Sequence, residues 1–142
     1  MLKGIPAILS PDLFDILMRM GHGDEIVLSD GNFPAGSLCG KVVWQSGADI
    51  CELLKAVLDF FPLDESEPCP VTLMRPADAA DSPAIWGRYA EIIREKSGPG
   101  DRVGYLSRYE FYDRTRKAYA VAVTGEKTRY ANIMLRKGVV QD

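Results

Sequence analysis

Short apolar runs and amphipathic segments alternate along almost the whole 142-residue chain, and this alternation constrains the fold more than any other feature. The apolar runs are short and typical of buried strands. They lie at residues 25–29, 42–44, 70–74, 103–106, 118–123 and 132–135. The amphipathic segments have helical spacing and lie at 11–20, 50–61, 84–96 and 107–116. This order predicts an α/β fold: a single domain over residues 1–142, in three layers, with helices on both faces of a largely parallel sheet.

Residues at the ends of these segments support the helix assignments. Ser10-Pro11-Asp12 is typical of a helix start, with an N-cap, a proline at the first helical position and an acid in the first turn. We expect Gly21 to end this helix as a C′ glycine and Asp49 to cap the second helix. The Gly, Asn and Pro residues between 30 and 40 predict a loop.

The charge balance and the apolar content exclude several classes of protein. Seventeen Lys and Arg side chains against twenty Asp and Glu give a net charge of 17 − 20 = −3. A basic face for nucleic acid or an anionic membrane is therefore not expected. The longest apolar run, Ala118–Val123, is far shorter than the roughly 20 residues that span a bilayer. The first residues contain no long apolar stretch, so a signal peptide is not expected.

The cysteines indicate a reducing environment. Cys39, Cys51 and Cys69 are odd in number and form no Cys-x-x-Cys pair. We therefore expect reduced thiols in a cytoplasmic protein. No metal site is expected, because the chain has a single histidine and no paired cysteines.

His22, the only histidine, is the first candidate for catalysis. A lone histidine is more often structural or merely exposed, but its surroundings favour a functional role here. The flanking Gly21 and Gly23 leave the imidazole accessible, and acidic residues at 24, 25 and 30 are near enough in sequence to orient the ring. Histidine is the side chain best suited to exchange protons near neutral pH.

Several other residues suit a polyhydroxylated ligand. Asp30 directly follows a strand, where α/β proteins bind ligands, although an Asp there is equally often a turn former or a helix cap. Arg108 and the aromatic residues after it, including Tyr112, can stack on sugars or bases, but such residues are more often part of a core or a helix face. Tyr130 and Asn132 both donate and accept hydrogen bonds.

Two further patterns favour ordinary structural roles. Residues 98–104 superficially resemble a phosphate loop, but they precede a strand and lack Gly-Lys-Ser/Thr, which favours a turn. Lys127, Arg129, Arg136 and Lys137 are spread over a turn and a strand, which favours a solvated face over a nucleic-acid patch.

Taken together, these residues resemble the RbsD/FucU family of sugar mutarotases, and its fucose mutarotase branch more than its ribose pyranase branch. The resemblance covers nearly the whole chain and is loose over residues 65–100. It rests on an ordered set of segments: Met1-Leu2-Lys3-Gly4-Ile5, Met20-Gly21-His22-Gly23-Asp24-Glu25, Ser29-Asp30, Phe33-Pro34-Ala35, Leu63-Asp64, Arg108 with Phe111-Tyr112, Lys117-Ala118-Tyr119-Ala120, Thr124-Gly125-Glu126, Tyr130 with Asn132-Ile133, and Lys137-Gly138.

The resemblance implies an RbsD-like fold and an isomerase that interconverts the anomers of L-fucose or a related free aldose, or its pyranose and furanose forms, without cofactor or metal. It implies His22 as the catalytic acid and base. It implies substrate-binding roles for six further residues, of which the last is the least certain: Asp30, Arg108, Tyr112, Tyr130, Asn132 and Asp64. Family members form ring-shaped homo-oligomers, typically decamers, with sites at subunit contacts. We therefore expect Tyr130 and Asn132 to reach the His22 of a neighbouring copy.

Two departures from the family pattern affect the expected sugar pocket. The loop over residues 31–36 lacks the histidine that fucose-type relatives carry, and the Tyr-Gly-Asn signature reads Tyr130-Ala131-Asn132. A sugar other than fucose therefore stays open as the substrate. Two other functions stay open as well: a non-catalytic monosaccharide-binding protein accessory to transport or regulation, and a structural oligomer with a vestigial pocket.

Overall fold

A six-stranded sheet in the order β2-β5-β1-β6-β3-β4 organises the chain. The computed structural model describes residues 1–100 and 102–141. The strands are β1 (Glu25–Ser29), β2 (Val42–Gln45), β3 (Val71–Met74), β4 (Val103–Leu106), β5 (Ala120–Thr124) and β6 (Ile133–Arg136). β6 runs antiparallel to its neighbours β1 and β3, and every other strand pair is parallel. The predicted α/β fold with a largely parallel sheet is confirmed.

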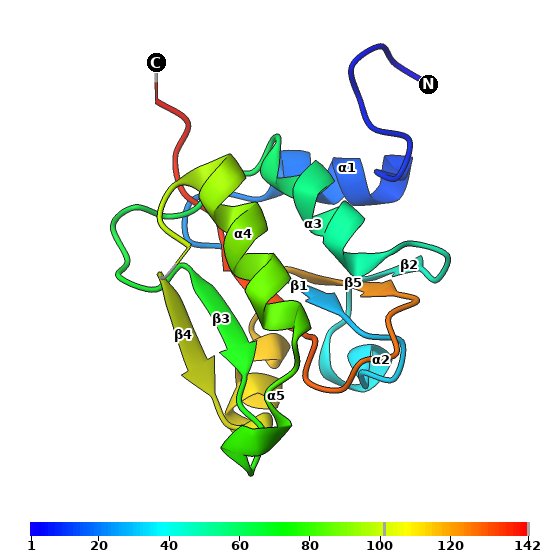
Figure 1. The fold of residues 1–142 in the computed structure, drawn as a ribbon. Coiled ribbons are helices and arrows are strands. Elements are labelled where there is room, and N and C mark those ends of the chain that lie inside the picture. The colour runs from blue at the N-terminus through cyan, green and yellow to red at the C-terminus, as the bar shows by residue number, and fades with distance from the viewer. Residues whose placement is uncertain (101, 142) are drawn as a thin grey trace.

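Helices cover both faces of this sheet and complete three layers (Figure 1). On one face lie α1 (Pro11–Arg19), α3 (Ile50–Leu58) and α4 (Ile85–Ser97), and on the other lie α2 (Ala35–Leu38) and α5 (Arg108–Arg116). Successive strand residues point to opposite faces. In β1, Ile26 and Leu28 belong to the core under α1, α3 and α4, whereas Val27 packs with the α2 and α5 side. β1, β3, β5 and β6 are buried along most of their length and are mainly apolar, whereas the edge strands β2 and β4 are partly exposed.

The structure differs from the sequence prediction at several local positions, among them the end of α3, which stops at Leu58 and not at residue 61. The predicted loop at 30–40 contains the short helix α2, which the Gly and Pro residues concealed. Gly21 is not a left-handed C′ residue. α1 ends at Arg19, and the backbone of its C-cap residue, Met20, is extended. The left-handed position falls at Gly23, with φ of 87°. β5 begins at Ala120 instead of residue 118, since residues 117–119 form the turn after α5.

The three cysteines are free thiols, with Cys39 and Cys51 buried and Cys69 exposed. Over residues 1–100 and 102–141, no helix is both long and apolar enough to cross a membrane.

The segment after β6 packs tightly against residues 62–64 and yields a stability prediction. A Cβ on Gly138 would lie 2.6 Å from the Leu63 carbonyl oxygen and 2.9 Å from the Asp64 Cα. Gly138→Ala must therefore move backbone, and we expect it to lower the free energy of unfolding by about 1–3 kcal/mol. Urea denaturation measures this loss. Gly40→Ala is the matched control, because nothing lies within 4 Å of its added Cβ; equal stability of both variants contradicts the packing argument.

Candidate functional site

A pocket of about 360 Å³ opens where β1 and β3 end and β6 begins. Five of the seven predicted site residues line it: Asp30, Arg108, Tyr112, Tyr130 and Asn132. The antiparallel direction of β6 explains this convergence. The start of β6 meets the carboxyl ends of β1 and β3, so residues far apart in sequence reach the same edge. This is the edge at which α/β proteins bind ligands.

Asp30 is the acidic group of the pocket. It is 7% exposed, and its Oδ1 accepts a 2.8 Å hydrogen bond from the backbone N–H of Asn32. Burial raises the pKa of the Asp30 carboxyl above its ordinary value, and the Asn32 N–H opposes part of this rise. The backbone N–H of Asp30 donates to Asn132 Oδ1 at 2.9 Å. Asp30 therefore has Oδ1 held by its own turn, and its carboxyl lines the pocket, where it can accept from a ligand.

The 130–132 segment is held from behind by α4. Trp86 donates from its indole nitrogen to the Tyr130 carbonyl at 2.9 Å, and the buried Tyr89 hydroxyl donates to the Ala131 carbonyl at 2.6 Å. Tyr130 has φ of 60°, the only positive φ of a non-glycine residue among those described. Such strain persists only where surrounding contacts impose it and is typical of ligand sites. Asn132 is 3% exposed, and its side chain is held at the pocket by Asp30, whose backbone N–H donates to Asn132 Oδ1.

A cation and an apolar wall complete the pocket. Arg108 donates from Nε to the Tyr112 hydroxyl at 3.0 Å, which joins the two residues into one polar group. The Tyr112 ring meets Phe33 edge to face at 5.6 Å between centroids. Phe33 and Met74 provide apolar surface. A pocket that combines carboxylate, guanidinium, phenol and amide groups with apolar surface suits a monosaccharide.

Sequence reasoning did not assign five residues that line this pocket: Asn32, Phe33, Met74, Lys127 and Arg129. Lys127 and Arg129 are exposed, as expected for a solvated face, and the loop before β6 also brings them to the pocket edge. The signal that could have located Asn32 and Met74 is their position, since one follows β1 closely and the other ends β3.

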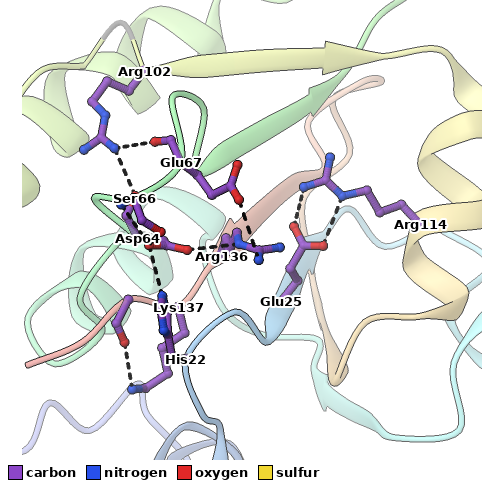
Figure 2. Close-up of polar contacts among 10 residues, drawn as sticks. His22, Glu25, Asp64, Ser66, Glu67, Arg102, Arg114, Arg136 and Lys137 are labelled. Carbon is purple, nitrogen blue, oxygen red and sulfur yellow. Dashed lines mark hydrogen bonds and ion pairs between the residues drawn. The ribbon is translucent and has the colours of Figure 1, made fainter.

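The structure places the other two predicted residues, His22 and Asp64, at the opposite end of β1 (Figure 2). His22 lies before β1 and is 53% exposed, and its Nε2 lies 3.3 Å from Oδ1 of Asp64. Asp64 is therefore not grouped with the five pocket residues. It was placed by tertiary packing, since its backbone N–H donates to the carbonyl of Arg136 at the end of β6.

Asp64 is a nearly buried, ionised carboxylate. It is 2% exposed, and it accepts from the Ser66 hydroxyl at 2.6 Å, from the Ser66 backbone N–H at 3.0 Å and from Arg136 Nε at 3.1 Å. The Ser66 hydroxyl, more than any other group, holds the pKa of Asp64 well below its usual range. An ionised carboxylate has no proton to donate, so Nε2 of His22 carries the hydrogen of this contact. In the neutral ring, Nδ1 is then the free base.

Within one chain, His22 and the pocket lie too far apart to act on one sugar. The five residues of β1 lie between them, and four steps of a strand at about 3.3 Å each cover roughly 13 Å. A shared site therefore requires two copies of the chain. Within the described residues, no group of three His, Cys, Asp or Glu side chains is placed to hold a metal ion.

The RbsD/FucU transport protein family matches residues 3–140 of the chain. The chain belongs to this family. The human fucose mutarotase is 46% identical over 147 residues, which span 98% of this chain and 94% of the human protein. The L-fucose mutarotase of Actinobacillus pleuropneumoniae serotype 5b (strain L20) is 42% identical over 98% of this chain and 97% of its own length.

A solved structure of the same family agrees closely with this fold. The crystal structure of the fucose mutarotase from Streptococcus pneumoniae in complex with L-fucose is 45% identical and has a TM-score of 0.95, with 99% of this chain and 100% of that chain covered. The resemblance to the RbsD/FucU family that the sequence motifs indicated is confirmed.

Proposed function

We propose that this RbsD/FucU family member is a cofactor-independent mutarotase that interconverts the anomers of L-fucose or a related free aldose. The observation that carries the proposal is the pocket at the carboxyl ends of β1 and β3, where five residues expected to bind sugar converge. Its residues are of the types that bind hydroxyl groups, and relatives at 42–46% identity are fucose mutarotases.

The pocket can hold a 6-deoxy sugar by complementary contacts. The Asp30 carboxyl accepts hydrogen bonds from sugar hydroxyls, while the Asn132 amide and the Arg108 guanidinium donate. Phe33 and Met74 face the apolar C–H surface and the methyl group of such a sugar. An unmatched hydroxyl would leave a buried polar group without a partner, which gives the pocket its selectivity.

The reaction needs two proton transfers. A base removes the proton from the anomeric hydroxyl, an acid delivers one to the ring oxygen, and the open aldehyde rotates and closes again. His22 performs these transfers through Nδ1, because Asp64 occupies Nε2. A water molecule or the Tyr112 hydroxyl relays the second proton, and Arg108 stabilises negative charge that develops on the sugar oxygen.

This mechanism requires that His22 of one copy face the pocket of another. The exposed ring and its distance from its own pocket support this arrangement. A closed ring of copies satisfies it at every site, because head-to-tail contacts repeat until they close. A decamer and a cytoplasmic location remain predictions from the sequence.

Saturation-transfer NMR on equilibrated L-fucose tests the proposal. The protein is expected to accelerate exchange between the α and β anomers, and D-ribose, D-galactose and L-rhamnose measured in parallel report its substrate range and any furanose exchange.

Asp30→Asn keeps the acceptor for the Asn32 N–H and removes the charge. We expect kcat/KM to fall about 10- to 100-fold, the cost of one charged hydrogen bond. If the wild-type protein exchanges the anomers of all four sugars no faster than buffer does, the proposed function is wrong.

The second candidate, a non-catalytic monosaccharide-binding protein, is favoured by one observation. The pocket of a single chain contains no histidine, since the 31–36 loop lacks one and His22 lies at the other end of β1. Titration calorimetry separates the two functions: tight sugar binding by a protein that leaves anomer exchange unchanged selects the binding function.

A further inference from the structure

Arg136, the last residue of β6, holds a central place in the cluster around His22 (Figure 2). Its Nε donates to Oδ2 of Asp64 at 3.1 Å, and its Nη2 lies 3.8 Å from Glu67. It is 31% exposed, so the guanidinium is partly withdrawn from water. Salt screens such a pair less than a fully exposed one.

The two oxygens of Asp64 have different partners. Oδ1 receives the Ser66 hydroxyl, the Ser66 backbone N–H and the contact with His22. Oδ2 has Arg136 as its hydrogen-bond partner among the described residues. Ser66 therefore holds one oxygen of Asp64 and Arg136 holds the other. The two residues together fix the plane of the carboxylate. That plane sets the direction in which Oδ1 meets the imidazole.

The backbone beside His22 is also built around this guanidinium. A Cβ on Gly23 would lie 3.2 Å from Nη2 of Arg136, so the glycine leaves room for the guanidinium. The turn is tied to the same strand end, because the Gly23 N–H donates to the Lys137 carbonyl and the Lys137 N–H donates to the Asp24 carbonyl, both at 2.8 Å. The turn and the Asp64 carboxylate thus meet at the Arg136 side chain, and the His22 ring contacts the same carboxylate.

We infer that Arg136 is a positioning residue that fixes the Asp64 carboxylate and, through it, the ring orientation and the tautomer of His22. The inference rests on the proposed function for its effect on rate. Its effect on the tautomer stands independently. Two other charged residues lie near Arg136 and Asp64. Glu67 lies 3.8 Å from the Arg136 guanidinium, and Arg102 donates to the backbone carbonyls of Asp64 and Glu67.

Kinetics of anomer exchange provide the first readout. Arg136→Gln removes the charge and the fixed Nε contact. We expect kcat for L-fucose to fall about tenfold, the scale expected when a reacting group loses its orientation, while KM changes less than about twofold. Arg136→Lys keeps the charge without the Nε geometry and is expected to lie between. The control is Arg114→Gln, which breaks a two-bond ion pair with Glu25 in the same region and touches neither Asp64 nor His22.

The single histidine provides the second readout, which needs no substrate. Magic-angle-spinning NMR of sedimented protein labelled with ¹⁵N-histidine reports the His22 tautomer without ambiguity, whatever the size of the oligomer. At a pH where the ring is neutral, we expect the Nε2–H tautomer to dominate in the wild type and in Arg114→Gln. We expect a mixture of both tautomers in Arg136→Gln and an intermediate ratio in Arg136→Lys.

The outcomes separate this inference from the proposed function. A wild-type tautomer ratio and a wild-type kcat in folded Arg136→Gln overturn the inference, as does an equal loss in Arg114→Gln. If Arg136→Gln does not fold, Arg136→Lys decides, and wild-type values in both readouts overturn it. If the wild type catalyses no exchange, the proposed function fails, while the tautomer comparison still decides the role of Arg136.

Discussion

His22→Ala is expected to reduce anomer exchange of L-fucose by about 10²- to 10⁴-fold, the contribution of general acid and base catalysis by one positioned side chain. His22 is the only histidine of the chain, so no second imidazole can replace it. Saturation-transfer NMR at matched protein concentration measures the loss. Free imidazole added to the variant is the matched control, because it can enter the exposed space that the 53% exposed side chain leaves and is expected to restore part of the rate.

The same substitution is expected to leave stability nearly unchanged. His22 is exposed, and its side-chain contact is the 3.3 Å approach to Asp64. Asp64 keeps Ser66 and Arg136 when the ring is removed, so no buried charge is left without a partner. We expect the free energy of unfolding to stay within about 0.5 kcal/mol of the wild type. If His22→Ala exchanges the anomers of L-fucose at a rate within twofold of the wild type, His22 has no part in the mechanism.

Mixing two impaired variants is expected to restore activity, which is the second large effect. His22→Ala keeps an intact pocket, and Asp30→Asn keeps an intact His22. If each site takes its histidine from one copy and its pocket from another, a random 1:1 oligomer has both parts intact in about one quarter of its sites. Co-expression with two different tags and tandem purification isolates such mixed oligomers. Their kcat/KM for L-fucose is expected to be about a quarter of the wild-type value, above the tenth or less that either variant alone retains.

The control for this mixture separates shared sites from other effects. His22→Ala mixed with the double variant His22→Ala/Asp30→Asn contains no intact histidine and is expected to stay inactive. If the site lies within one chain, the mixture of single variants stays at the mean of the two, and the two-copy site is then wrong. A monomer in sedimentation analysis also contradicts it.

The helices and strands followed largely from local sequence. Residues that pack into one core recur at helical spacing in α1, and the caps Ser10 and Asp49 are confirmed by side-chain hydrogen bonds to the first backbone N–H groups. α2 could not be predicted, because a four-residue helix has too few turns to show a period, and its N-cap, Pro34, makes no side-chain cap. The left-handed residue is Gly23 and not Gly21, and local sequence could not show that Arg136 lies where a Cβ on Gly23 would be.

Local sequence determined the types of element, the apolar faces that the core uses, and the chemistry of most candidate residues, because period, capping and side-chain chemistry act over a few neighbours. Tertiary structure alone decided where those residues lie. The antiparallel insertion of β6 between β1 and β3 gathers Asp30 and Asn132, 102 positions apart, at one edge, and carries Arg136 to Asp64 at the other. Strand pairing between distant segments depends on the packing of the whole sheet, and that packing separates His22 from the pocket of its own chain.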